Sequence, residues 1–195
     1  QDCRIHYAVL DSGGISPNVV QAYAKVRYVV RAPDLPGLLS LIERVKKVAQ
    51  GAALMTETTM ESTILAGVSN LMVNTPLMDV MQDIWDSVGT PEFDAKDVAF
   101  AQQIRATLSP EDIAASWRQE ELDERDIPLA DFVLPAHTRL KQMGGSTDVG
   151  DVSWVVPTVQ AYGPTLSIGT QLHTWQVVSQ GKSPLAHKGM VTTAK

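Results

Sequence analysis

The sequence predicts an α+β fold, and three observations support this prediction. Segments 4–10 and 22–30 alternate between apolar and polar residues, which is typical of strands with one buried face. Segment 35–50 instead repeats its apolar residues at helical spacing. From about residue 74 onward, several helix-start signals follow one another. A strand–strand–helix unit followed by a helical half is the pattern of an α+β protein.

The two predicted strands each have one apolar and one polar face. In the first strand the apolar face is formed by Ile5, Tyr7 and Val9, and the polar face by Arg4, His6 and Ala8. In the second strand the apolar face is formed by Ala22, Ala24, Val26, Tyr28 and Val30, and the basic face by Lys25, Arg27 and Arg31. Solvation explains such a basic face as readily as ligand binding does.

A helix and a third strand are predicted to complete this N-terminal part. Asp34 can cap a helix that runs from Leu35 to about Gln50, where Gly51 suits its end. Segment 56–65, which is rich in Thr and Met, is then predicted as another strand. The resulting small sandwich would keep one face of its sheet available for pairing with another protomer.

The second half of the chain is predicted to be mainly helical. One helix should begin at Thr75-Pro76 and end at Gly89, a second should span 94–108, and a third should begin at Ser109-Pro110. Segment 118–126 is densely charged and is expected to be a solvated connector. An apolar strand is predicted at 166–168, and a last helix near residue 187.

Composition excludes several classes of function. The chain has 195 residues and a net charge of −6, which argues against nucleic acid or an anionic membrane as its main partner. Its single cysteine, Cys3, cannot form an internal disulfide. No apolar run approaches the roughly 20 residues that a membrane span needs. Because the chain lacks an initiator methionine and a leading cap, we expect it to begin inside a larger protein.

The glycine-rich segment Gly144-Gly145-Ser146-Thr147 is the strongest candidate for a binding site. Glycines allow the backbone to approach a ligand closely, and N–H groups at such a turn can bind a carboxylate or phosphate. Asp148 and Asp151 would be a helix cap and a first-turn acid. The segment lacks the Gly-Lys-Ser/Thr of a phosphate-binding P-loop.

His173 is the second candidate, because it lies between an apolar segment and Trp175 and could supply a metal ligand or a base. A single histidine is more often a packed residue than a ligand, and zinc requires three or four ligands. A Ser153–His173–Asp148 hydrolase triad can be written, but nothing like a nucleophile elbow surrounds Ser153. His6, His137 and His187 receive no assigned role.

Five segments resemble the metal-dependent amidohydrolases of the aminoacylase and glutamate carboxypeptidase superfamily. They are residues 4–9, 13–20, 44–54, 145–154 and 173–189, and the most specific is Gly-Ser-Thr-Asp-Val-Gly-Asp-Val-Ser-Trp at 145–154. The resemblance implies a truncated ferredoxin-like lid domain that dimerises, at residues 1–72. Residues 73–195 would be the C-terminal part of an α/β metallopeptidase catalytic domain. The implied reaction cleaves an amide next to a carboxylate, with p-aminobenzoyl-glutamate as the expected substrate and p-aminobenzoate and glutamate as products.

The resemblance also implies roles for individual residues. His173 matches the family's last metal ligand, for zinc or manganese. Asn18 and Arg31 match lid residues that hold the substrate of the partner protomer, and Arg is suited to a bidentate grip on a carboxylate. Gly144, Gly145, Ser146 and Thr147 would line the carboxylate pocket. A homodimer formed through the lid, a second hydrolase subunit and a cytoplasmic location are the corresponding expectations.

Other parts of the family's site are absent from these 195 residues. The other metal ligands, the general-base carboxylate and the lid histidine that polarises the scissile carbonyl lie in an N-terminal half that this sequence does not contain. We therefore assign no catalytic residue within the chain and expect it to be inactive alone. Two alternatives stay open: a non-catalytic dimerisation and amino-acid-binding module, and a structural subunit of a two-subunit hydrolase.

Overall fold

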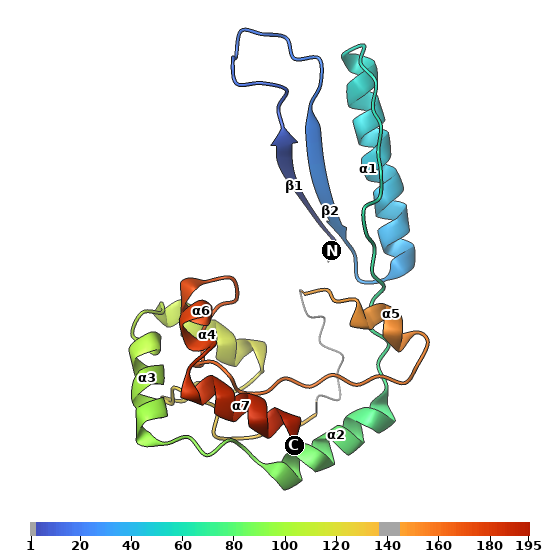
Figure 1. Ribbon diagram of the computed structural model, residues 1–195. Coiled ribbons are helices and arrows are strands. Elements are labelled where there is room, and N and C mark those ends of the chain that lie inside the picture. Colours follow the sequence, from blue (N-terminus) through green and yellow to red (C-terminus); the bar gives the residue numbers. More distant parts are fainter. Residues whose placement is uncertain (1–2, 137–144) are drawn as a thin grey trace. The chain divides into compact units, whose positions relative to one another are not determined.

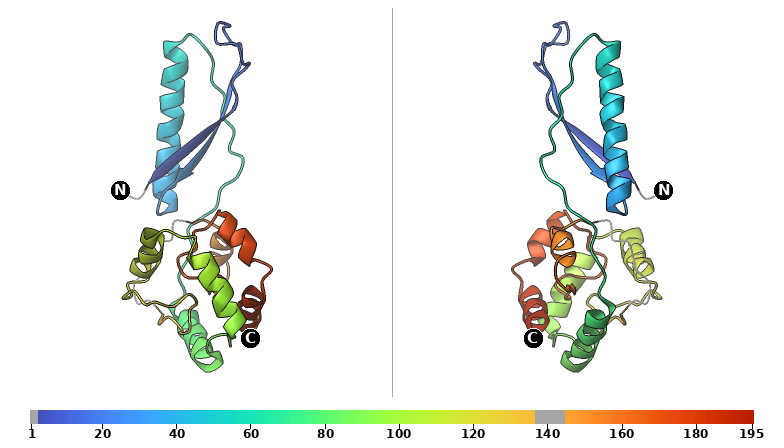
Figure 2. Two further views of the ribbon diagram at one scale, coloured as in Figure 1. Left: turned by 90° about the vertical axis from the view of Figure 1, so that its left-hand side faces the viewer. Right: turned by 90° about the vertical axis from the view of Figure 1, so that its right-hand side faces the viewer.

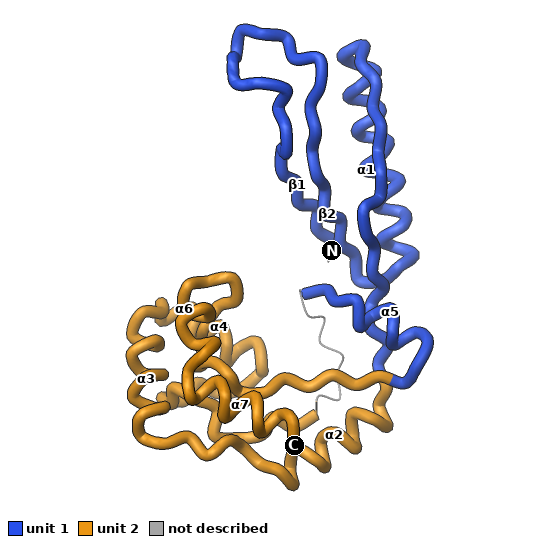
Figure 3. Tube along the Cα trace, viewed as in Figure 1, with its two compact units in different colours: residues 1–73, 140–157 blue, residues 74–139, 158–195 orange. Residues whose placement is uncertain are grey.

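The computed structural model describes residues 3–136 and 145–195, and the chain divides into two compact units (Figure 3). Unit 1 comprises residues 1–73 and 140–157, and unit 2 comprises residues 74–139 and 158–195. A small antiparallel sheet lies in unit 1, and helices occur in both units. The α+β class predicted from the sequence is therefore confirmed.

Unit 1 is built on a β-hairpin. β1 (Arg4–Asp11) pairs with β2 (Lys25–Arg31) in antiparallel register. One face carries the pairs Ile5–Val30, Tyr7–Tyr28 and Val9–Val26, and the other carries Arg4–Arg31, His6–Val29 and Ala8–Arg27. The Tyr7 and Tyr28 ring centroids are 6.0 Å apart, within the usual range for an aromatic pair. The assignment of residues to the two faces, predicted from the alternation in the sequence, is therefore correct in both strands.

Helix α1 (Leu35–Met55) follows the hairpin directly and lies beside it (Figures 1 and 2). As predicted, Asp34 caps the helix, because its Oδ1 accepts the N–H of Gly37 at 2.8 Å. The predicted end at Gly51 is wrong. The helix continues to Met55, and its last turn is closed by Thr56, whose hydroxyl donates to the carbonyl of Ala52 at 2.9 Å. This capping outweighs the cost of one glycine in a helix, about 1 kcal/mol.

The third strand predicted at 56–65 is not formed. Its first residues serve the end of α1 instead, since the N–H groups of Thr56 and Thr58 donate to the carbonyls of Ala52 and Ala53. Glu57 has a left-handed backbone with φ of 53°, which takes the chain out of helical geometry. Within the described residues, segment 59–65 joins no ladder, because β1 and β2 pair with each other alone.

The helices of unit 2 begin where the sequence predicts, at α2 (Thr75–Val88), α3 (Ala95–Arg105) and α4 (Pro110–Gln119). Asn74, Asp94 and Ser109 each accept a backbone N–H from the first turn of the following helix. Helices α6 (Trp175–Gln180) and α7 (Pro184–Ala194) complete the unit. The last helix starts three residues before His187, because Ser183 caps it.

The strand predicted at 166–168 is wrong. Among the described residues, its backbone bond to another segment runs from the N–H of Ile168 to the carbonyl of Pro128, at 2.9 Å. The N–H of Ser167 donates to a side chain, the amide oxygen of Gln180. A segment whose backbone groups are paired in this way does not join a sheet.

The core of unit 2 is small and lies between α3, α7 and the segment after α4. It consists of Ala101, Leu129 and Leu185, against which Phe93, Val98 and Phe100 pack. Trp117 is also buried and stacks on Phe132, with 6.0 Å between the ring centroids. Among the described residues, no helix combines the length and apolar character needed to cross a membrane.

A pair of carboxylates and a lysine join α7 to the start of α3. Nζ of Lys188 lies 2.9 Å from Asp94 and 2.5 Å from the buried Asp97. The hydrogen bond from Lys188, together with backbone N–H groups of α3, lowers the pKa of Asp94 to about 2. Conversely, hydrogen bonds to Asp97 and then Asp94 raise the pKa of Lys188.

These shifts predict how stability depends on pH. The pKa of Asp94 falls on folding from 3.8 to about 2. Asp94 therefore stabilises the folded state at pH values above 3.8, and this stabilisation is lost as the pH drops towards about 2. The pKa of Lys188 rises on folding from 10.5. Lys188 therefore stabilises the folded state at pH values below 10.5, and this stabilisation is lost above its folded pKa. We expect Asp94→Asn to lower the thermal midpoint at neutral pH, and the deficit to disappear near pH 2. A deficit that stays constant over this range would contradict the assignment.

Candidate functional site

His173 lies in a loop of unit 2 that immediately precedes α6. Its backbone is left-handed, with φ of 64°, a conformation that is uncommon for residues other than glycine. The side chain is exposed. Within the described part of the chain, the imidazole makes no hydrogen bond. Unusual backbone geometry of this kind occurs preferentially at functional sites.

Gln180, at the end of α6, closes the base of this loop. Its side chain is fully buried, and its amide oxygen accepts the N–H of Ser167 at 2.7 Å. Its amide nitrogen donates to the hydroxyl of Thr170 at 3.1 Å and to the carbonyl of Gln176 at 3.0 Å. One side chain therefore ties the entry of the loop to the helix that follows it.

The entry of the loop is held further by Ser167 and Gly169. The Ser167 hydroxyl lies 3.1 Å from the carbonyls of both Ala101 and Pro128, which anchors it to α3 and the segment after α4. Gly169 has φ of 94°, and a Cβ there would lie 3.1 Å from the Cα of Ile113. Only glycine fits this backbone without strain. His173 is thus mounted on a loop with a rigid base.

The glycine-rich segment lies in unit 1. Gly144 lies outside the described residues, as does His137. Gly145, Ser146 and Thr147 are exposed and have no regular structure before α5 (Val149–Ser153). The predicted cap by the Asp148 side chain is not formed. The hydroxyl of Thr147 accepts the N–H of Val149 instead, at 3.3 Å.

Three side chains of the α5 region hold residues 69–72, the end of the segment that leads from α1 towards α2. Asp151 accepts the N–H of Ser69 at 2.8 Å, and Ser153 accepts the N–H of Met72 at 2.8 Å. The indole N–H of Trp154 donates to the carbonyl of Asn70 at 2.7 Å. Hydrogen bonds from Ser69 also lower the pKa of Asp151. Asp151 is therefore an acid in the first turn of α5, as predicted, and its carboxylate also accepts a backbone N–H from residues 69–72.

Asn18 and Arg31, the two residues expected to hold the substrate, are not close together in the hairpin. Arg31 is the last residue of β2 and is partly buried, whereas Asn18 lies in the exposed loop between the strands (Figure 1). Seven residues of β2 separate the loop end from the Arg31 end, about 20 Å at about 3.4 Å per residue. One small ligand does not touch both residues of the same hairpin.

The structure forms no complete metal site among the described residues. No group of three or more His, Cys, Asp or Glu side chains there is arranged to hold an ion. His173 belongs to unit 2, while Asn18, Arg31 and residues 145–147 belong to unit 1. The candidate residues therefore form three separate parts: the loop that carries His173, the glycine-rich segment at 145–147, and the hairpin end at Arg31.

Sequence reasoning did not identify three residues that lie beside the candidate residues. Gln180 and Ser167 hold the base of the His173 loop, and Arg4 pairs with Arg31. A glutamine between Ser179 and Gly181 has no pattern that marks it as buried. The alternation of the first strand did place Arg4 on the polar face, but the register that sets it opposite Arg31 requires the structure.

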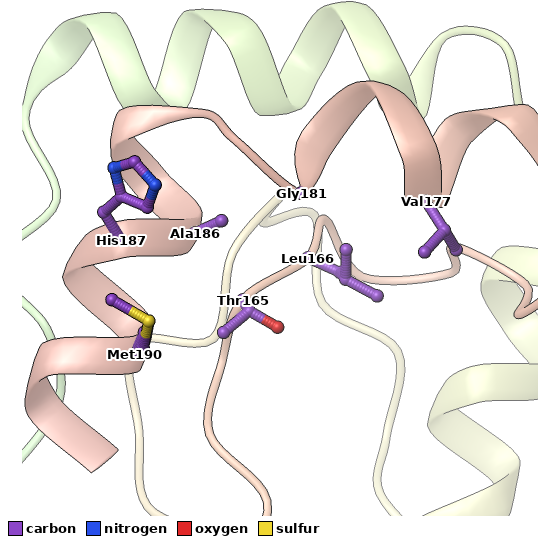
Figure 4. Close-up of a pocket in the computed structure, with 7 residues that line it drawn as sticks. All are labelled: Thr165, Leu166, Val177, Gly181, Ala186, His187 and Met190. Carbon is purple, nitrogen blue, oxygen red and sulfur yellow. The ribbon is translucent and has the colours of Figure 1, made fainter. Parts of the chain in front are cut away.

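A shallow pocket of unit 2 lies between α6 and α7 (Figure 4). It has a volume of about 310 Å³ and is lined by Thr165, Leu166, Val177, Gly181, Ala186, His187 and Met190. Its walls are mainly apolar, and none of the expected site residues lines it. The pocket therefore does not coincide with the candidate site.

Comparison with known proteins confirms the resemblance that the motifs indicated. The chain is 44% identical, over its full length, to the B subunit of p-aminobenzoyl-glutamate hydrolase from Escherichia coli (strain K12), and it covers 43% of that protein. It is 25% identical over 98% of its length to Xaa-Arg dipeptidases of Mus musculus and Homo sapiens, of which it covers 35% and 34%. The chain thus spans less than half the length of these relatives.

No family model matches the chain, and no solved structure matches it either.

Proposed function

We propose that this chain forms part of a metal-dependent amidohydrolase that cleaves an amide bond next to a carboxylate. Its substrate would be p-aminobenzoyl-glutamate, and the products would be p-aminobenzoate and glutamate. The observation that carries the proposal is the 44% identity, over the full chain, to one subunit of p-aminobenzoyl-glutamate hydrolase. The similarity to Xaa-Arg dipeptidases supports the same reaction class, hydrolysis of an amide beside a terminal carboxylate.

In this proposal, residues 1–72 are a truncated ferredoxin-like lid and residues 73–195 are the C-terminal part of an α/β catalytic domain. The lid would form a homodimer and present Asn18 and Arg31 to the partner's substrate. Because the Escherichia coli relative is named as one subunit of its hydrolase, a second, different subunit is a further expected partner. We also propose a cytoplasmic location, in keeping with a chain that has one cysteine.

A divalent metal, zinc or manganese, would supply a Lewis acid and an activated water in such an enzyme. The exposed imidazole of His173 suits one ligand position, but zinc requires three or four ligands. The described residues do not complete such a set. We therefore derive no step through the metal and assign the chain's own residues to substrate binding.

The binding roles follow from charge and hydrogen-bonding capacity. Arg31 would grip a carboxylate through two parallel N–H···O bonds. Gly144, Gly145, Ser146 and Thr147 would cradle a carboxylate, and the exposed backbone at 145–147 supports this role. Because β2, about 20 Å long, lies between the loop that holds Asn18 and Arg31, we propose that Asn18 contacts a different part of the site.

Replacing Arg31 with alanine should weaken binding of p-aminobenzoyl-glutamate. A hydrogen bond between charged groups contributes about 1.5–3 kcal/mol, so the dissociation constant should rise by about 10- to 150-fold. Equilibrium dialysis of the purified 195-residue chain measures this directly. An unchanged dissociation constant would remove Arg31 from the site.

A matched control is Arg27→Ala, which removes a guanidinium from the same face of the same strand. Arg27 pairs with Ala8, four residues from the Arg31 end, and it should alter affinity little. An equal loss in both variants would indicate a general effect of charge rather than a specific grip.

A further inference from the structure

The loop of residues 12–24, which joins β1 to β2, presents apolar side chains to solvent (Figure 1). Ile15 is 100% exposed and Val20 is 98% exposed, so the described residues cover neither side chain. Val19 and Tyr23, in the same loop, are also more than half exposed. Isolated exposed apolar residues are common on protein surfaces, but a group of them on one element marks an interaction surface.

The base of this loop is held in a defined shape. Asp11 Oδ1 accepts the N–H of Gly13 at 2.8 Å, and the hydroxyl of Ser12 donates to the carbonyl of Gly14 at 2.9 Å. Gly13 has φ of 80°, and a Cβ there would lie 2.2 Å from the carbonyl oxygen of Tyr23. The two limbs of the loop are therefore in close contact, and only glycine fits between them.

The tip of the loop is a turn that contains Asn18. The N–H of Val19 donates to the carbonyl of Ser16 at 3.3 Å, which closes the turn around Pro17 and Asn18. Proline fixes its own φ, and asparagine is favoured in turns. The two fully exposed apolar residues come directly before and directly after this turn. The loop thus presents a polar amide between two apolar side chains, and its preformed shape lowers the entropy cost of docking.

The loop contains no charged residue, although the chain is acidic. Residues 12–24 contain no Asp, Glu, Lys, Arg or His, whereas the whole chain has a net charge of −6. The charged residues at its base, Asp11 and Lys25, are opposite each other in the register of the strands. Two copies of an acidic chain repel each other. An uncharged apolar loop is a surface on which they can approach with the least repulsion.

The length of the hairpin favours a second copy as the partner. β2, about 20 Å long, lies between the loop and Arg31, so one small ligand does not touch Asn18 and Arg31 of the same hairpin. A site that uses both residues therefore takes Asn18 from a second hairpin.

We propose that the loop of one copy docks on a second copy of this chain, with Ile15 and Val20 as its apolar anchors, and places Asn18 in that copy's site. The inference rests on the proposed function, in which Asn18 and Arg31 both contact the substrate. It adds to that function the side chains that attach the loop to its partner.

Sedimentation equilibrium of the purified 195-residue chain tests the two anchors. Wild type should form a dimer of about 42 kDa, twice the chain mass of 21.2 kDa. Ile15→Ser and Val20→Ser should each raise the dimer dissociation constant by about 10-fold or more, because each removes an anchor from both copies; 10-fold is equivalent to 1.4 kcal/mol. Both side chains are exposed, so the circular dichroism spectrum should not change.

Val178→Ser is the matched control, because it makes the same chemical change at a valine of α6 that is 80% exposed. Its dimer dissociation constant should stay near the wild-type value. An equal rise in all three variants would indicate a general effect of lost apolar surface and would overturn the assignment to the loop. A wild-type chain that stays monomeric throughout the micromolar range would overturn it as well.

Phosphatidylcholine vesicles test a lipid surface as the other apolar partner. We expect the wild-type dimer to remain in solution when the vesicles are sedimented. If wild type sedimented with the vesicles and Ile15→Ser did not, the loop would be assigned to a lipid surface and docking on a second copy would be overturned.

Asn18→Ala separates this inference from the function on which it rests. The variant should keep the wild-type dimer and bind p-aminobenzoyl-glutamate less tightly in equilibrium dialysis. If it binds as tightly as wild type, the placement of Asn18 in the site is overturned. If Ile15→Ser leaves the dimer intact while Asn18→Ala weakens binding, the docking loop is overturned and the proposed function stands. If the wild-type dimer does not bind the ligand, the proposed function fails, and the dimer dissociation constants alone decide the docking of the loop.

Discussion

Replacing Gln180 with leucine is expected to destabilise unit 2 by about 2–4 kcal/mol. The buried amide makes three hydrogen bonds, and leucine, with a similar volume, can make none of them. The N–H of Ser167 would lose its acceptor inside the protein, which costs about 1–3 kcal/mol, and the two donated bonds contribute about 1 kcal/mol each. The apolar surface that leucine buries offsets only part of this loss.

Thermal unfolding followed by circular dichroism measures the effect. For a domain of this size, about 2–4 kcal/mol corresponds to a midpoint lower by about 5–15 °C. Gln176→Leu is a matched control in the same helix, because the Gln176 side chain makes one long hydrogen bond, 3.4 Å to Thr107. We expect the control to change stability by about 0.5 kcal/mol at most. Equal losses in both variants would contradict a special role for Gln180.

The same variant should alter the His173 loop even at temperatures where the protein stays folded. Gln180 holds Thr170, three residues before His173, and removal of that bond frees the loop to leave its left-handed backbone. The imidazole resonances of His173 should therefore shift in Gln180→Leu and remain unchanged in Gln176→Leu. This readout does not depend on metal or on turnover.

Local signals in the sequence accounted for much of the fold. The predicted cap Asp34 accepts a backbone N–H of its helix, and so do Asn74, Asp94 and Ser109 at the other predicted helix starts, because a short polar side chain at that position meets its own helix. The alternation of the hairpin was also sufficient, since a two-residue period fixes which side chains share a face.

The two predicted strands that did not form share one physical cause. Their backbone N–H groups are hydrogen-bonded to an adjacent helix or to a distant side chain, so these groups do not pair with another strand. Segment 56–65 has the composition of a strand, yet Thr56 and Thr58 are engaged by the end of α1. Segment 166–168 is apolar, yet the N–H of Ser167 bonds to a side chain thirteen residues away. Neither of these hydrogen bonds can be predicted from the composition of the segment itself.

The candidate site shows the same limit. His173 and the glycine segment were identifiable from residue type and resemblance, but their supports were not. The contacts that hold α5 join residues more than 80 positions apart, such as Asp151 and Ser69. The cross-strand pair Arg4–Arg31 depends on a register that the loop between the strands determines.

Gly150→Ala tests the support of the glycine segment and is the second large effect that we expect. Gly150 is buried in α5, where a Cβ would lie 2.1 Å from the carbonyl oxygen of Ser69. That oxygen belongs to the backbone, so α5 or residues 69–72 must move by close to 1 Å to reach the 3.0 Å below which real contacts are essentially absent. A displacement of this size breaks the hydrogen bonds that Asp151, Ser153 and Trp154 make.

The balance of energies favours destabilisation. Three hydrogen bonds at about 1 kcal/mol each outweigh the gain of about 1 kcal/mol from alanine in a helix, so unit 1 should lose about 2 kcal/mol. Gly145→Ala is the control within the same segment, since a Cβ there meets no atom within 4 Å. Urea unfolding monitored by tryptophan fluorescence, which includes Trp154, measures both variants. If Gly150→Ala were as stable as Gly145→Ala, the close packing of α5 on residues 69–72 would be refuted, and the glycine segment would have to be held by other contacts.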